Sequence, residues 1–205
     1  MVGVAVVGPF AEAVRATTQP CTFLLIAPAT IAVVTARSRW QALAAVVVAG
    51  VVGGWLLAGN WYVLDGWALR VSGIAVIALL AVLVWGPRSR VERLHDQRTQ
   101  TALAGVVTFV ATLWWRPCVG VELGDILNGA QDGIGGQLIP MSAYMLGAMV
   151  PVAGVALIHR VVEPSDRVVF GAAVVAFAVG AVVAGSIALG QHDDVVVTLT
   201  RWTLE

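Results

Sequence analysis

Two proline–cysteine pairs occupy corresponding places in two long apolar segments of the chain. They are Pro20-Cys21 and Pro117-Cys118, and the chain has no other cysteine. A proline inside a membrane helix frees a backbone carbonyl that neighbouring groups must satisfy. Two thiols are the minimum for thiol–disulfide exchange, in which one thiolate attacks and the other resolves the mixed disulfide. The pattern therefore predicts a paired redox site built from two broken helices.

A buried thiol is inert unless something stabilises its thiolate. A helix that restarts after each proline offers free backbone N–H groups and the positive end of its dipole. In the second segment Arg116 adds a positive charge two residues before Cys118. Cys21 and Cys118 are therefore the candidate catalytic pair, and Arg116 is a candidate helper.

Two carboxylates follow the second cysteine. Glu122 and Asp125 come four and seven residues after Cys118, so the three share one face of a helix. In one interpretation Glu122 accepts the proton that dithiol oxidation releases, and in another all three residues bind a soft or borderline metal ion in transit. In a third, Asp125 lies at the outer interface and Glu122 pairs with Arg116 or Arg15.

The composition is typical of a membrane protein. Of 205 residues, 59% are hydrophobic and 12% are charged, and the mean hydropathy is +0.89. The net charge is zero, so nucleic acid is not an expected partner, whereas membrane lipid is. At this length the chain holds one membrane domain and little else.

Apolar runs of about 20 residues predict spanning helices, because a bilayer core is about 30 Å thick and a helix rises about 1.5 Å per residue. Four runs are uninterrupted: 41–59, 67–86, 138–158 and 168–190. Two longer segments contain the Pro-Cys pairs and are expected to break there: 4–35 and 101–130. The sequence thus predicts an all-α integral membrane protein of six transmembrane helices, with helices 1 and 4 broken.

Arginines indicate the orientation. All twelve basic residues are arginine, and the side opposite the three basic connections holds only Arg201. The connections 36–40, 87–100 and 159–167 hold Arg37, Arg39, Arg88, Arg90, Arg93, Arg98, Arg160 and Arg167. Because basic loops face the cytoplasm, both termini are predicted to be extracytoplasmic, including the tail 191–205.

The two halves of the chain can be aligned. Residues 11–21 read AEAVRATTQPC, and residues 108–118 read TFVATLWWRPC. Each Pro-Cys precedes a further helical run and two plain spans, so the domain 1–190 divides into repeats at about 1–86 and 101–190. Because each triplet crosses the membrane three times, an odd number, the second triplet starts on the opposite side of the membrane. The repeat is therefore inverted. Inverted repeats with broken helices place a site near the midplane, which would bring the two cysteines together.

Smaller features add local predictions. Thr17 and Thr18 precede the first Pro-Cys pair and are expected to bond carbonyls that the proline frees. Pro140 and Pro151, with Gly147 between them, predict a kinked fifth span that can bend or pack closely.

The histidines form no cluster in the predicted topology. His95 and His159 are assigned to cytoplasmic connections and His192 to the tail, and all three are expected to be solvated.

With these residues the chain resembles CcdA and the transmembrane domain of DsbD, six-helix proteins with a Pro-Cys pair in helices 1 and 4. The family pattern is Pro-Cys-x-Gly-Pro-x-x-Gly-x-Ile-Leu, and the matching residues here are Pro117, Cys118, Gly120, Gly124, Ile126 and Leu127. The family commonly has a second proline three residues after each cysteine, where this chain has Leu24 and Val121.

The resemblance implies a thiol–disulfide oxidoreductase of the bacterial inner membrane that carries electrons without a bound cofactor. Cytoplasmic thioredoxin would reduce the cysteine pair, which would then reduce an extracytoplasmic thioredoxin-like protein, for cytochrome c maturation or a similar task. Two alternatives stay open. One is a heavy-metal or small-solute transporter that depends on Glu122 and Asp125. The other is a non-catalytic membrane subunit of a larger complex, which the missing prolines favour.

Overall fold

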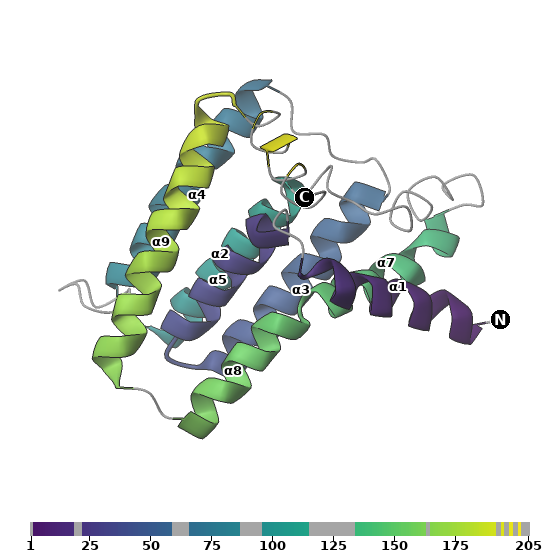
Figure 1. Cartoon of the computed structure of the whole chain (residues 1–205), viewed down its shortest axis with the longest axis horizontal. Helices are drawn as coiled ribbons and strands as arrows, with labels where there is room; N and C mark the ends of the chain where they lie inside the picture. Colours follow the sequence, from purple (N-terminus) through teal and green to yellow (C-terminus); the bar gives the residue numbers. More distant parts are fainter. Residues whose placement is uncertain are drawn as a thin grey trace.

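The computed structural model of the protein describes residues 2–18, 22–58, 66–86, 96–114, 134–162 and 165–191, with residues 194, 197, 198 and 201 of the tail. Within these ranges every regular element is a helix (Figure 1). The helices are α1 (Val2–Ala16), α2 (Phe23–Thr35), α3 (Arg39–Ala58), α4 (Gly66–Trp85), α5 (Gln97–Trp114), α7 (Ile134–Ala148), α8 (Val150–Val162) and α9 (Asp166–Ala188).

Four helical stretches are long and apolar enough to cross a membrane. They coincide with the four uninterrupted runs of the sequence and cover Arg39–Ala58, Gly66–Trp85, Gln137–His159 and Asp166–Ala188. Large apolar side chains on these helices point outward, and Val48, Ile74, Val175 and Val182 are each at least 61% exposed. Soluble proteins rarely expose so continuous an apolar surface. The fold is therefore that of a multi-pass membrane protein.

Helix α2 lies at the centre of the bundle. It contacts α3, α4, α5, α8 and α9, and Figure 1 shows it beside α5, between the α4–α9 pair and α3. Its residues Leu25, Ala29, Ile31, Ala32 and Val33 are at most 1% exposed. A helix that is apolar all round is expected in the interior of a bundle, and most of α2 is buried there.

Glycines allow two pairs of helices to cross closely. A Cβ atom added at Gly53 of α3 would lie 2.9 Å from the Cβ of Thr112 in α5. One added at Gly147 of α7 would meet the backbone carbonyl oxygen of Phe10 in α1. Small residues at such crossings let backbones approach and gain dispersion contacts, which drive helix association in lipid.

The α4–α9 pair is held in the same way. A Cβ atom at Gly73 of α4 would lie 2.7 Å from the backbone oxygen of Ala184 in α9. Gly190 ends α9 with a φ of 84°, a left-handed conformation that glycine adopts without steric cost. The guanidinium of Arg70 in α4 packs over this glycine, 2.7 Å from the position of an added Cβ. There the cation also faces the negative end of the α9 dipole.

Methionines fill the space between α3 and α7. Met141, Met145 and Met149 recur at every fourth residue, so they share one face of the span, and they are at most 2% exposed. They pack against glycines of α3, where added Cβ atoms would lie 2.9 Å from Met149 Cε at Gly50 and 2.7 Å from Met145 Cγ at Gly54. Flexible thioethers fill the irregular gaps that glycines leave.

The fifth span, predicted to be kinked by its two prolines, contains Pro140 within α7 and divides into two helices near Pro151. The span consists of α7, which ends at Ala148, and α8, which begins at Val150. Pro151 has no N–H group to continue the helical hydrogen bonds, which explains the break at this point.

Candidate functional site

The first predicted helix is interrupted where the sequence carries its Pro-Cys pair. Helix α1 ends at Ala16 and α2 begins at Phe23. Pro20 and Cys21 themselves lie outside the described residues. The described residues on either side of them define the boundaries of the break.

Two threonines close the last turn of α1. The Thr17 hydroxyl donates to the carbonyl of Val14 at 2.6 Å, and the Thr18 hydroxyl donates to the carbonyl of Arg15 at 2.8 Å. The backbone N–H groups of Thr17 and Thr18 bond the same two carbonyls at 3.2 Å, so the end of the helix is tightened by bonds of the 3₁₀ type. Neither threonine bonds the Ala16 carbonyl, which Pro20 leaves without its helical partner, so the prediction that they bond a carbonyl freed by the proline is wrong in its acceptor.

A third threonine, Thr22, bonds the carbonyl that loses its helical partner because of Pro20. The predictions from the sequence did not include this residue. In a continuous helix the N–H of residue 20 would bond the carbonyl of Ala16, but Pro20 has no N–H. The Thr22 hydroxyl donates to that carbonyl at 2.6 Å, and Thr22 is 1% exposed. The signal in the sequence was a hydroxyl residue directly after the Pro-Cys pair.

The variant Thr22→Val is expected to destabilise the break. It would remove the buried hydrogen bond that the Thr22 hydroxyl donates to the Ala16 carbonyl, at a cost of about 1–3 kcal/mol. A lower melting temperature in detergent would report this loss. Thr18→Val is the matched control, since the Thr18 hydroxyl is exposed, and its melting temperature should stay near that of the wild type. Equal melting temperatures for both variants would contradict the assigned role of Thr22.

The second Pro-Cys pair follows α5 in the sequence. This helix ends at Trp114, three residues before the second Pro-Cys pair. The remaining predicted site residues lie outside the described part of the chain: Arg116, Pro117, Cys118, Glu122 and Asp125. Their roles stay predictions.

Helices α2 and α5 pack side by side in opposite directions. Arg37, just after the end of α2, donates its backbone N–H to Gln100 Oε1 in the first turn of α5 at 2.8 Å. The two helices are in contact along their lengths (Figure 1). Since they are antiparallel, the start of α2 and the end of α5 belong to the same end of the pair. In the sequence, Thr22 at the start of α2 follows the first Pro-Cys pair, and Trp114 at the end of α5 precedes the second.

The surroundings of this end are apolar, and their polar groups are satisfied. Thr108 and Thr112 of α5 are fully buried and donate to the carbonyls of Ala104 and Thr108 at 2.9 and 2.8 Å. Thr22 caps α2 without a side-chain bond to the helix, because its hydroxyl is used on Ala16. Thr22 therefore does not cap the first N–H groups of α2 with its side chain.

The expected placement of His159 is wrong. It was assigned to a solvated connection, but α8 continues to Val162, and His159 is only 9% exposed. Neither of its ring nitrogens has a hydrogen-bond partner. The apolar residues before and after it, Ile158 and Val161, favour continuation of the membrane helix past the histidine.

No three side chains of His, Cys, Asp or Glu come together within the described ranges. The metal-binding interpretation concerned Cys118, Glu122 and Asp125, which lie outside those ranges.

A scan against protein families, a search of curated proteins and a search of solved structures found no match to the chain. Its function is therefore inferred from its residues and their placement.

Proposed function

We propose that the protein is a membrane thiol–disulfide relay with Cys21 and Cys118 as its redox pair. It carries reducing equivalents from cytoplasmic thioredoxin to an extracytoplasmic thioredoxin-like protein, for cytochrome c maturation. The observation that carries the proposal is the antiparallel α2–α5 pair, one end of which continues into both Pro-Cys segments. Cys21 directly precedes Thr22, and Cys118 follows Trp114 by four residues, a chain length of at most about 14 Å.

The packing of the helices supports a 3+3 inverted repeat. Such a repeat would exchange α1 with α5, α3 with α7, and α4 with α9. If each helix is replaced by its counterpart in the other repeat, the α1–α7 contact becomes an α5–α3 contact. The α4–α9 contact remains an α4–α9 contact. All three contacts occur in the bundle, and each has a glycine at its crossing: Gly147, Gly53 and Gly73. Six membrane-crossing segments in two equivalent triplets account for this pattern.

The distribution of arginines supports the orientation. Arg37, Arg39, Arg98 and Arg167 belong to the end where α2 finishes and α3, α5 and α9 begin. Because basic residues favour the cytoplasmic side, this end faces the cytoplasm of a bacterium and both termini face outward. From that end the 13 residues of α2 extend about 20 Å. The start of α2 thus lies inside a core of about 30 Å, where a site shared by two sides is expected.

The relay follows from thiol exchange. A thiolate of reduced thioredoxin attacks the Cys21–Cys118 disulfide, which forms a mixed disulfide and releases one cysteine thiolate. The second thioredoxin thiol then displaces the other cysteine, so thioredoxin leaves oxidised and the pair is reduced. The same two steps in reverse transfer the electrons and protons to the disulfide of the outer partner. The N–H groups that begin α2 and the charge of Arg116 stabilise the thiolates, and Glu122 accepts a proton.

The test is the redox state of the two cysteines in cells with and without cytoplasmic thioredoxin, measured by alkylation and gel shift. A Cys21–Cys118 disulfide should accumulate without thioredoxin and disappear when it is restored. Cys21→Ser and Cys118→Ser are the controls, because neither variant can form the disulfide. If both thiols stay reduced in every condition, the relay is wrong, and a transporter or a non-catalytic subunit takes its place.

A further inference from the structure

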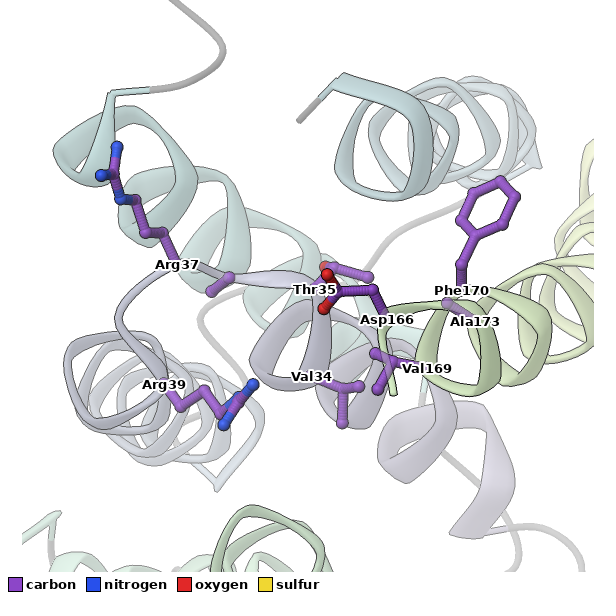
Figure 2. A pocket seen from close by; sticks show the side chains of 9 residues that line it. Val34, Thr35, Arg37, Arg39, Asp166, Val169, Phe170 and Ala173 are labelled. Atoms are coloured by element: carbon purple, nitrogen blue, oxygen red, sulfur yellow. The ribbon is translucent and has the colours of Figure 1, made fainter. Parts of the chain in front are cut away.

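A cavity opens at the arginine-rich end of the bundle, between α2, α3 and α9. It measures about 190 Å³, and its lining includes Thr35, Arg39, Asp166 and Val169. Figure 2 shows the Arg39 guanidinium and the Asp166 carboxylate on different sides of it, with Arg37 pointing away. Arg37 also belongs to the lining, but its side chain points away, so the cavity presents the Arg39 cation and the Asp166 anion at the end of the bundle where α3 and α9 begin.

These two charges do not satisfy each other. Arg39 Nε is buried and has no hydrogen-bond partner, and in the part of the chain that the structure describes no ion pair joins Arg39 to Asp166. A buried donor of a charged group is costly when it lacks an acceptor. An anion at Arg39 and a cation at Asp166 would both be stabilised here.

A second, apolar cleft continues from the first. It measures about 350 Å³, lies between α2, α8 and α9, and shares Val34, Val169 and Ala173 with the charged cavity. Along α9 it extends to Ala176, ten residues beyond Asp166, or about 15 Å at the rise of a helix. This is half the thickness of a bilayer core of about 30 Å. The cleft therefore follows the path of an acyl chain from the interface to the midplane.

The apolar cleft contains one unsatisfied polar side chain. His159 lines it, is 9% exposed, and has no partner at either ring nitrogen. A histidine buried in this way needs an acceptor for its N–H, and an ester carbonyl between a headgroup and an acyl chain is such a group.

We propose that the two cavities together bind one phosphatidylethanolamine-type lipid from the arginine-rich leaflet. Its phosphate lies at Arg39, its primary ammonium at Asp166, and one acyl chain in the cleft beside His159. Phosphatidylglycerol offers no cation to Asp166, and the quaternary amine of phosphatidylcholine has no N–H to donate to it. The site therefore discriminates by headgroup as well as by apolar fit. This inference is independent of the proposed relay.

Native mass spectrometry of the full chain tests the proposal, with the three lipids carrying identical acyl chains. Wild-type protein should retain one phosphatidylethanolamine about tenfold more tightly than either competitor, the scale of one charge-assisted hydrogen bond. Arg39→Gln should weaken binding of all three lipids, whereas Asp166→Asn should remove only the preference for ethanolamine. Arg167→Gln, a charge change one residue along α9 that lines neither cavity, should bind as the wild type does.

A second variant tests the cleft itself. Ala172 lines it from an exposed position on α9, so Ala172→Phe should fill it and displace the lipid without disturbing the fold. Ala178→Phe is the matched control, because Ala178 is exposed on the same helix and lines neither cavity. Equal retention of the three lipids by the wild type would overturn the proposal. So would unchanged binding in Ala172→Phe, or recovery of a quinone in place of phospholipid.

Discussion

Gly147→Leu is expected to separate α1 from α7 and to leave little folded protein. Any side chain at this position would meet the carbonyl oxygen of Phe10, and its Cβ would lie 2.8 Å from that of Ala13. A flexible side chain can move aside, but the backbone of α1 can only be displaced as a whole. Overpacking of this kind costs about 1–3 kcal/mol where neighbours can adjust, and more is expected against backbone.

Fluorescence-detected size-exclusion chromatography of detergent extracts measures this loss as a smaller monodisperse peak. The matched control is Gly154→Leu in α8, since a Cβ added at Gly154 would meet nothing within 4 Å. Both variants replace a glycine in the same span by the same side chain, so their difference isolates the α1–α7 contact. A normal peak for Gly147→Leu would show that the crossing can open without loss of the fold.

Cys21→Ser and Cys118→Ser are each expected to abolish electron transfer to the outer partner. A single thiol can form a mixed disulfide but cannot be released by an internal partner, so the intermediate should persist. Non-reducing gels should therefore reveal a complex with a thioredoxin-like protein in one or both single variants, and it should dissolve on addition of a dithiol reductant.

The double variant Cys21→Ser/Cys118→Ser is the control for this experiment, because it keeps the protein in the membrane without any thiol. It should trap nothing. If a single-cysteine variant still supports transfer at the wild-type rate, the two cysteines do not act as a pair. The trapping result would also identify which cysteine meets which partner.

The four uninterrupted membrane helices were predictable because their signal is length. The run 67–86 became Gly66–Trp85, and the run 168–190 became Asp166–Ala188. The break between α1 and α2 was predictable for a local reason, since a proline removes a specific hydrogen bond. In both cases the information lies within a short stretch of chain.

The contacts of the helices were not predictable in the same way. Helices that are apolar on every face carry no periodicity that would reveal which side meets a neighbour. The methionine face of α7 gained meaning only when Gly50 and Gly54 were found opposite it. The cleft that His159 lines is formed by three helices that are far apart in the sequence, so the burial of its unpartnered ring could not be predicted from the residues around it. Cys21 and Cys118 lie outside the described residues, so their pairing rests on the sequence and on the α2–α5 geometry.

The methionine contact between α3 and α7 is a surface along which these two helices can slide past each other. An unbranched thioether can change rotamer and keep its contact, so α3 can slide along α7 without opening a void. The α1–α7 crossing lacks this freedom, because at Gly147 it brings backbone against backbone. When α3 and α7 slide past each other, helix α1 is therefore expected to move together with α7. Such a motion would turn α1 relative to α2, and the hydrogen bond from the Thr22 hydroxyl to the Ala16 carbonyl is the described contact that would have to adapt.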